Sequence, residues 1–422
     1  MKELRALVER NRAGSGEAMV SVCSAHPDVI AASALLARDR GAPLLIEATS
    51  NQVNQFGGYT GMTPADFIGF VKAELAAVGA GDMPVLFGGD HLGPQVWRSE
   101  PAESAMAKAR DLIAAFVAAG FTKIHLDCSE GCAKEPAQVA DAVSAARAAE
   151  LCAVAEATAD DKDTLSYIYG TEVPPPGGAR AGEEPEAPHP TTPESAEATI
   201  AAHRAAFLAR GLEAAWPRAV GLVVQPGLEF APDHVFAFDR AAPDRLSPVL
   251  QAHPHLAFEA HSTDYQSDAT FPELGRRHFA VLKVGPALTF AWREGLYALD
   301  ALAGFLAGRA REPLPEVMER LMLAEPGNWR KHYSGTPDTE RLLRHFSYAD
   351  RIRYYWGRPE ARAAQAALMD ALGDKRPADM VLRQFFPEPI LEAARRLETP
   401  VIPWPRALLF AKVQAALGGY YG

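Results

Sequence analysis

Two histidines occur in sequence contexts that suit a catalytic metal site. His91 follows an aspartate in the segment GGDHLGP, and His261 lies in FEAHSTDYQ. Two imidazoles and one carboxylate leave a position open on a divalent ion such as Zn²⁺. Glu229 is the predicted third ligand, with Gln225 and Glu172 as alternatives. The other interpretation of either histidine is a hydrogen-bonded position beside the site.

Carboxylates near these histidines could transfer protons. Asp90 adjoins His91 and is predicted to act as a general acid and base, which requires a carboxyl group within hydrogen-bonding reach of the substrate. Glu229 and Asp127 are further catalytic candidates, and Asp127 could instead orient a hydroxyl group or a histidine. The alternatives are a cap on the following turn for Asp90 and ordinary loop hydrogen bonds for Asp127.

A phosphate group would need charge-assisted donors or backbone N–H groups. The segments Ser262-Thr263 and Gly285-Pro286-Ala287 could supply the backbone groups. Basic residues near the C-terminus could supply positive charge, although their alternative is a solvated or ion-paired helix face. These predicted phosphate-binding residues are Arg330, Lys331, Arg351 and Arg353.

These residues become neighbours only in a suitable fold. Short apolar segments alternate with helix-length amphipathic segments, a pattern typical of βα units around a parallel sheet. Eight such units predict a closed (β/α)8, or TIM, barrel of the α/β class. The segment SAHPD after the first strand is not the glycine-rich turn of an open doubly wound sheet. The predicted strands are Met19–Ser24, Pro43–Glu47, Pro84–Phe87, Lys123–Asp127, Leu165–Tyr169, Val220–Val224, Leu256–Ala260 and Ala280–Val284.

In such a barrel the functional residues follow the carboxyl ends of the strands. Polar residues follow all eight predicted strands, which predicts one polar pocket built from the whole ring. The predicted substrate-binding residues are His26, Glu47, Asn51, Gln52, Glu172, Gln225, Ser262, Thr263, Asp264, Lys283 and Gly285.

Two segments lie outside the repeat. Residues 174–192 are rich in Pro, Gly and Glu, which predicts a lid-like loop. The remaining pattern divides the chain into a barrel over residues 1–310 and a helical extension over 311–422. We expect the extension to pack on the barrel, because the segment FSYADRIRYYW is too apolar for a free tail.

The composition excludes several classes of partner. The net charge is -11, with 42 Lys+Arg and 53 Asp+Glu, which argues against nucleic acid and anionic membranes. No apolar run reaches the roughly 18 residues of a membrane span, and the segment MKELRALVERNRAG has no apolar leader. The 4 cysteines form no CxxC pair and fit free thiols in a reducing compartment. We therefore expect a cytoplasmic protein that binds a small sugar phosphate and forms a homo-oligomer.

A resemblance to a known family rests on motifs from about residue 20 onward. Together they resemble the GatZ/KbaZ family, whose members are described as the second, non-catalytic subunit of class II tagatose-1,6-bisphosphate aldolase. The motifs are VCSAHP, EATSNQVNQFGGYTGM, GGDHLGP, HLDCSEG, GTEVPPPGG, QPGLEF, FEAHSTDYQ, KVGPALTFA and DRIRYYW.

The family is similar in turn to class II fructose-bisphosphate aldolases, which are zinc barrels. That similarity implies an acid/base role for Asp90 and zinc-ligand roles for His91 and His261. The sequence departs from the aldolases at strand six, where QPGLEF replaces a third zinc histidine, and STD replaces their glycine-rich phosphate loop. A metal site completed by Glu229 is expected instead.

Two functions follow from the resemblance. Some members act as ketose-phosphate 4-epimerases, which implies metal-dependent conversion of D-tagatose 6-phosphate to D-fructose 6-phosphate by retro-aldol and aldol steps, in tagatose and galactitol catabolism. The alternative is a non-catalytic partner that stabilises a class II aldolase subunit. The polar ring favours an enzyme, because a purely structural subunit has no need of it. A kinase is disfavoured, because the sequence has no GxxxxGK[ST] loop.

Overall fold

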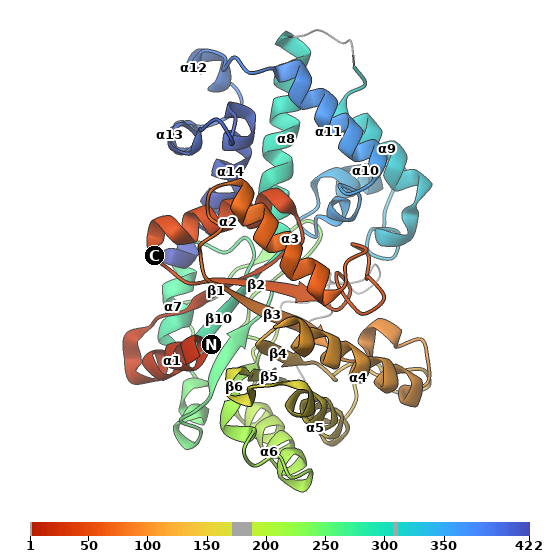
Figure 1. Ribbon diagram of the computed structural model, residues 1–422, viewed down its shortest axis with the longest axis vertical. Coiled ribbons are helices and arrows are strands. Elements are labelled where there is room, and N and C mark those ends of the chain that lie inside the picture. The colour runs from red at the N-terminus through yellow and green to blue at the C-terminus, as the bar shows by residue number, and fades with distance from the viewer. Residues whose placement is uncertain (1, 171–187, 307–310) are drawn as a thin grey trace.

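The barrel is built from short strands that are buried along almost their whole length. The computed structural model describes residues 2–170, 188–306 and 311–422. Its parallel strands close into a ring in the order β1-β10-β9-β6-β5-β4-β3-β2, with helices around it (Figure 1). The predicted (β/α)8 barrel is therefore confirmed. The barrel strands are β1 (Met19–Cys23), β2 (Leu44–Thr49), β3 (Val85–Leu92), β4 (Lys123–Leu126), β5 (Ser166–Tyr169), β6 (Ala219–Val223), β9 (Ala257–Ala260) and β10 (Phe279–Val284).

The helices between the strands begin at local signals in the sequence. Thr63 and Thr192 each accept a hydrogen bond from a backbone N–H of the first turn, and a proline follows each of them. The apolar faces of these helices cover the outside of the barrel. The helices are α2 (Pro27–Arg40), α3 (Pro64–Ala77), α4 (Ala102–Ala119), α5 (Asp141–Thr158), α6 (Pro193–Ala209), α7 (Thr270–Arg276) and α8 (Pro286–Leu306).

Helix α1 (Lys2–Arg10) closes the amino end of the barrel. Its buried side chains Leu4, Leu7 and Val8 join a cluster with Met19 and Leu45, which lie near the starts of β1 and β2. An apolar cluster therefore fills the amino end of the barrel.

Strand β3 continues past its predicted end at Phe87, since its ladder with β2 extends to Asp90. Between β6 and β9 the chain forms a two-stranded hairpin, β7 (Glu229–Phe230) and β8 (Val235–Phe236).

The last part of the chain packs on one side of the barrel (Figure 1). Helix α14 lies against both α2 and α8, where Arg406 Nε lies 2.8 Å from Asp28 Oδ1. The boundary near residue 310 stays a prediction, because residues 307–310 lie outside the described ranges. No described helix is both long and apolar enough to cross a membrane. The helices are α9 (Leu314–Ala324), α10 (Pro337–Phe346), α11 (Pro359–Leu372), α12 (Asp379–Leu382), α13 (Glu388–Leu397) and α14 (Trp404–Leu417).

Candidate metal centre and substrate pocket

A layer of charged side chains lies inside the barrel, next to the apolar cluster at its amino end. We call it the charged layer. Successive side chains of a strand point alternately inward and outward, and four strands point a charged residue inward at this level. They are Glu47 of β2, Lys123 of β4, Glu259 of β9 and Lys283 of β10. Gly88 of β3 leaves room for this layer, since a Cβ atom there would lie 2.6 Å from Glu47 Cγ.

Ion pairs hold the charged layer together. Lys123 Nζ lies 2.6 Å from Glu47 Oε1 and 2.8 Å from Glu259 Oε2. Lys283 Nζ lies 3.3 Å from Glu47 Oε2 and forms a second ion pair with Asp90. Burial favours neutral amines, but the surrounding carboxylates outweigh it and raise the pKa of both lysines. Each charge in this layer therefore has an oppositely charged neighbour, which offsets part of the cost of burying it.

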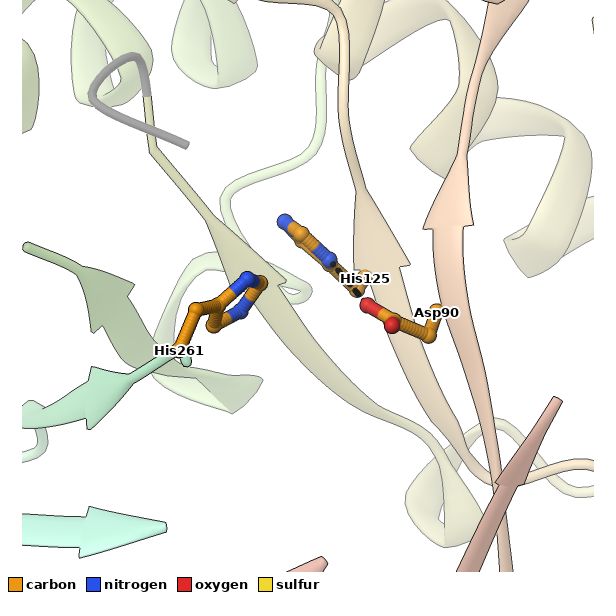
Figure 2. A group of neighbouring side chains, drawn as sticks. All are labelled: Asp90, His125 and His261. Carbon is orange, nitrogen blue, oxygen red and sulfur yellow. Dashed lines mark hydrogen bonds and ion pairs between the residues drawn. The ribbon is translucent and has the colours of Figure 1, made fainter. Parts of the chain in front are cut away.

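Three imidazole rings meet beside this layer. The ring centroids of His91, His125 and His261 are 5.3 Å apart in every pair. Figure 2 shows His125 and His261 on either side of a common space, with Asp90 beside His125. His125 Nε2 is buried and has no hydrogen-bond partner among the described residues. A buried polar atom of this kind is costly unless a ligand satisfies it.

Each ring is held by its own carboxylate. Metal-binding histidines commonly use one ring nitrogen for such a contact, which orients the other nitrogen toward the ion. The arrangement therefore leaves one nitrogen of each ring available. The contacts are 2.7 Å from His91 Nδ1 to Asp127 Oδ2, 2.9 Å from His125 Nδ1 to Asp90 Oδ1, and 3.0 Å from His261 Nε2 to Glu259 Oε1.

The protonation states of His261 and Asp90 suit a cation. Burial lowers the pKa of His91, but Asp90 and Asp127 outweigh it and raise that pKa above its usual value. Burial, aided by Lys283, lowers the pKa of His261 to about 3, so this imidazole is neutral near pH 7. Metal binding requires that neutral form. Burial opposes ionisation of Asp90, but His91 and Lys283 hold its pKa well below the usual range. Asp90 is therefore an ionised carboxylate.

Within the described ranges, two groups of side chains bring possible ligand atoms within 4.8 Å of one another. One combines Asp90 with the His125 and His261 imidazoles, and the other combines it with Cys23 and Glu47. The predicted ligand His91 belongs to neither group. The Lys283 ammonium already contacts both carboxylates of the second group. The first group is rich in nitrogen and fits Zn²⁺ or a similar divalent ion.

Asp90 and His261 of the first group line a pocket at the carboxyl end of the strands. The loop after β2 contributes Tyr59, and the C-terminal extension contributes Arg353 and Tyr354. The Tyr59 and Tyr354 rings lie 4.8 Å apart, and the Arg353 guanidinium lies over the Tyr354 ring. Ten of the predicted site residues line this pocket. They are Asn51, Gln52, Asp90, His91, His261, Ser262, Asp264, Lys283, Gly285 and Arg353.

Other predicted substrate-binding residues have local contacts instead. The Gln225 side chain accepts hydrogen bonds from two backbone N–H groups of its own turn. Thr263 Oγ1 donates to the carbonyl of Lys283, and the His26 ring packs 4.2 Å from the Trp292 ring. Glu47 lies in the charged layer. Glu172 and most of the predicted lid, up to residue 187, lie outside the described residues.

The predicted phosphate-binding residues are dispersed. Arg353 lines the pocket, but Arg330 and Lys331 are exposed on the surface. Arg351 is buried and its Nε donates to the carbonyl of Asn328. The structure therefore brings one of these four side chains to the imidazoles.

Glu229 does not belong to either group of possible ligands. It begins the hairpin strand β7, and its carboxylate accepts a hydrogen bond from Phe230 N at 3.0 Å. Burial raises the pKa of Glu229 to about 7, an effect that nearby Asp264 increases. The geometry thus supplies His125 where the sequence suggested Glu229.

Known proteins match the chain over almost its whole length. A family model described as D-tagatose-1,6-bisphosphate aldolase subunit GatZ/KbaZ-like matches residues 4–422. The chain belongs to this family. A D-tagatose 6-phosphate 4-epimerase from Agrobacterium fabrum is 49% identical over 421 residues, which cover 99% of this chain and 97% of that protein.

A crystal structure from the same comparisons shares the fold. It is described as a probable tagatose 6 phosphate kinase from Sinorhizobium meliloti 1021. Its TM-score is 0.85 at 47% identity, over 96% of this chain and 99% of that one. The GatZ/KbaZ resemblance and the barrel are both confirmed.

Strained backbone occurs at the site of this GatZ/KbaZ-like chain. His91 and Ser262, which line the pocket, have φ angles of 49° and 54°. Left-handed conformations are unfavourable for residues with a Cβ atom and gather where function requires a special geometry.

Sequence reasoning missed two interior residues of this GatZ/KbaZ-like site, Lys123 and His125. Both lie inside strand β4, whereas the predicted site residues lie at or after the ends of the strands. The segment KIHLD does carry a signal, because its polar residues alternate with Ile124 and Leu126. In a strand, such alternation places the polar side chains on one face, and in this barrel that face is the interior.

Proposed function

We propose that the protein interconverts D-tagatose 6-phosphate and D-fructose 6-phosphate by inverting carbon 4, with a bound divalent cation, Zn²⁺. The cluster of three carboxylate-held imidazoles beside Asp90 carries this proposal. It lies at the end of the barrel where catalytic sites of this fold occur. The 49% identical relative named as a D-tagatose 6-phosphate 4-epimerase supports the same substrate.

We assign the cation to the free ring nitrogens of His125 and His261, two members of the first group. We add His91, which belongs to neither group, because its ring centroid lies 5.3 Å from each of theirs. Coordination by three ring nitrogens would keep a position open for substrate. The assignment leaves the Asp90 carboxylate, which lines the pocket, to exchange protons. Arg353 is the proposed partner of the phosphate, because its guanidinium can form charge-assisted hydrogen bonds.

The proposed reaction breaks and remakes one carbon–carbon bond. The cation would supply Lewis-acid polarisation of the substrate oxygens. Asp90 takes the proton of the 4-hydroxyl group, and the bond between carbons 3 and 4 breaks to an aldehyde and a three-carbon enediolate. The aldehyde turns over and the bond reforms on its other face. Asp90 then returns the proton to oxygen 4.

The first experiment follows fructose 6-phosphate formed from tagatose 6-phosphate by the purified protein, together with its bound metal. We expect turnover that a chelator abolishes and Zn²⁺ restores. His261→Ala should lose both metal and turnover, whereas His253→Ala, whose ring pairs with Glu197 away from the pocket, should keep both. Turnover that persists in fully metal-free protein would refute the metal-dependent mechanism.

A non-catalytic role as an aldolase subunit is the second candidate, because the family description names one. The buried charged layer and the three oriented imidazoles weigh against it, since a structural subunit would have no use for them. The two functions can be separated directly. Protein without turnover that raises the activity of an added class II aldolase would establish the accessory role.

A further inference from the structure

A carboxylate of the protein occupies the start of helix α8. Backbone N–H groups at a helix N-terminus attract anions, and in barrels of this kind the loops after the last strands often bind phosphate there. In this protein Asp264 Oδ1 accepts hydrogen bonds from Gly285 N at 3.0 Å and Ala287 N at 2.8 Å. The phosphate position predicted from the sequence at this helix is therefore filled.

The loop that carries Asp264 is firmly attached. Thr263 N and Thr263 Oγ1 both donate to the carbonyl of Lys283, at 3.1 Å and 2.7 Å. Tyr420, from the C-terminal end of the chain, donates to the carbonyl of Thr263 at 2.9 Å. Asp264 itself is 2% exposed. Displacing its carboxylate would break two hydrogen bonds to a charged group and disturb this loop, which makes displacement costly.

The pocket also has little positive charge to offer a second phosphate. Its two basic lining residues are Lys283 and Arg353. Lys283 is paired with the carboxylates of Asp90 and Glu47. The hydrogen bonds of Arg353 go to backbone carbonyls and to the Tyr354 hydroxyl. One guanidinium, without a bonded carboxylate, therefore faces the substrate.

We propose that Asp264 restricts the substrate to ketohexose monophosphates, because its carboxylate fills the second phosphate position and repels a 1,6-bisphosphate. This inference rests on the proposed function, and it names the residue that selects between two sugar phosphates. The negative charge of Asp264 would repel the second phosphate of a bisphosphate. Specific binding sites often use such repulsion against the wrong ligand.

The test measures binding of two analogues that cannot react, because their carbonyl is reduced: a hexitol 6-phosphate and the matching hexitol 1,6-bisphosphate. Calorimetry on the full-length, Zn²⁺-loaded protein gives both dissociation constants. We expect the monophosphate to bind about tenfold more tightly or better. Asp264→Ser should reduce that preference by about tenfold, mainly through tighter binding of the bisphosphate.

Two further variants make the result specific. Asp264→Asn keeps an oxygen for the backbone N–H groups but removes the charge, so it should reduce the preference by a smaller factor even if the serine variant fails to fold. Asp268→Ser changes an exposed aspartate four residues away and should leave the preference unchanged. Equal binding of the two analogues by the unmodified protein, or an unchanged preference in Asp264→Asn, would overturn the inference.

Binding and turnover together distinguish failure of the epimerase proposal from failure of the proposal for Asp264. Selective binding of the monophosphate without turnover of tagatose 6-phosphate would refute the epimerase proposal and support the role of Asp264. Turnover with equal binding of the two analogues would support the epimerase and refute the role of Asp264.

Discussion

Asp90 contacts two of the three imidazoles and one lysine of the charged layer. Its carboxylate is hydrogen-bonded to His125, forms an ion pair with Lys283, and lies 3.6 Å from His91 Nε2. A carboxylate in this position can interact both with a bound cation and with a substrate in the pocket. Its contribution can be measured by changing its charge without changing its size.

We predict that Asp90→Asn lowers the turnover number by about 10²–10⁴-fold, because an amide cannot accept the proton of the 4-hydroxyl group. Bound metal should remain, since the proposed ligands are imidazoles. Steady-state kinetics and metal analysis check both expectations. Asp160→Asn, at an exposed position, is the control. Loss of metal from Asp90→Asn would instead identify Asp90 as a ligand.

We predict that Glu229 makes a pH-dependent contribution to the stability of the folded protein. Burial raises its pKa to about 7, so the folded state holds the proton more tightly than the unfolded state, where the pKa is about 4.3. The resulting stabilisation is complete below the unfolded pKa and is lost as the pH rises through the folded pKa. Relative to Glu229→Gln, the urea midpoint of the unmodified protein should therefore fall between pH 5 and pH 8. A difference that is constant with pH would contradict this.

Among the structural elements, the short strand β4 contributes residues both to the charged layer and to the proposed metal site. Its inward positions hold Lys123 and His125, and Asp127 follows directly after it. Lys123 links the carboxylates of Glu47 and Glu259, and Glu259 in turn holds His261. The strand therefore connects the charged layer to the proposed metal ligands.

Lys123→Met should lower the free energy of unfolding by about 3–5 kcal/mol, because it removes the nearer cation of two buried carboxylates. Only Lys283 then remains, at 3.3 Å from Glu47 and 3.8 Å from Glu259. Urea denaturation measures the change. Lys72→Met, at an exposed position of helix α3, is the matched control and should have little effect. Adding Glu259→Gln to Lys123→Met should recover part of the loss. A loss near zero for Lys123→Met would show that the layer does not depend on this ion pair.

In the molecule as a whole, the C-terminal helices complete both the core and the site. Helix α14 buries Leu408 and Leu409 against α2 and α8, and the segment after α10 brings Arg353 and Tyr354 into the pocket. The barrel and the extension thus share one hydrophobic core, although the sequence pattern divides them near residue 310.

We predict that a fragment of residues 1–310 does not fold by itself. Apolar faces of α2 and α8 would be exposed to water, at a cost of about 25 cal/mol for each Å². Circular dichroism and thermal unfolding of the fragment, beside the full-length protein, provide the measurement. A soluble fragment with a cooperative transition would contradict the prediction and support two independent domains.

The amino-acid sequence by itself determined the number and order of the barrel strands, because burial imposes a periodicity that can be read locally. It also placed Asp90, His91 and His261 at one end of the barrel, since all parallel strands end on the same side. These inferences needed only the pattern of each segment. The polar alternation in KIHLD could have added His125 and Lys123 by the same reasoning.

Only the tertiary structure decided which side chains are partners. The sequence contains both Glu229 and His125 as possible ligands. Closure of the barrel placed His125, and not Glu229, beside His261. The same closure brought Asp264 to the start of helix α8 and left Arg330 on the surface. Such contacts join residues far apart in the chain, so they depend on strand stagger and helix packing rather than on any local pattern.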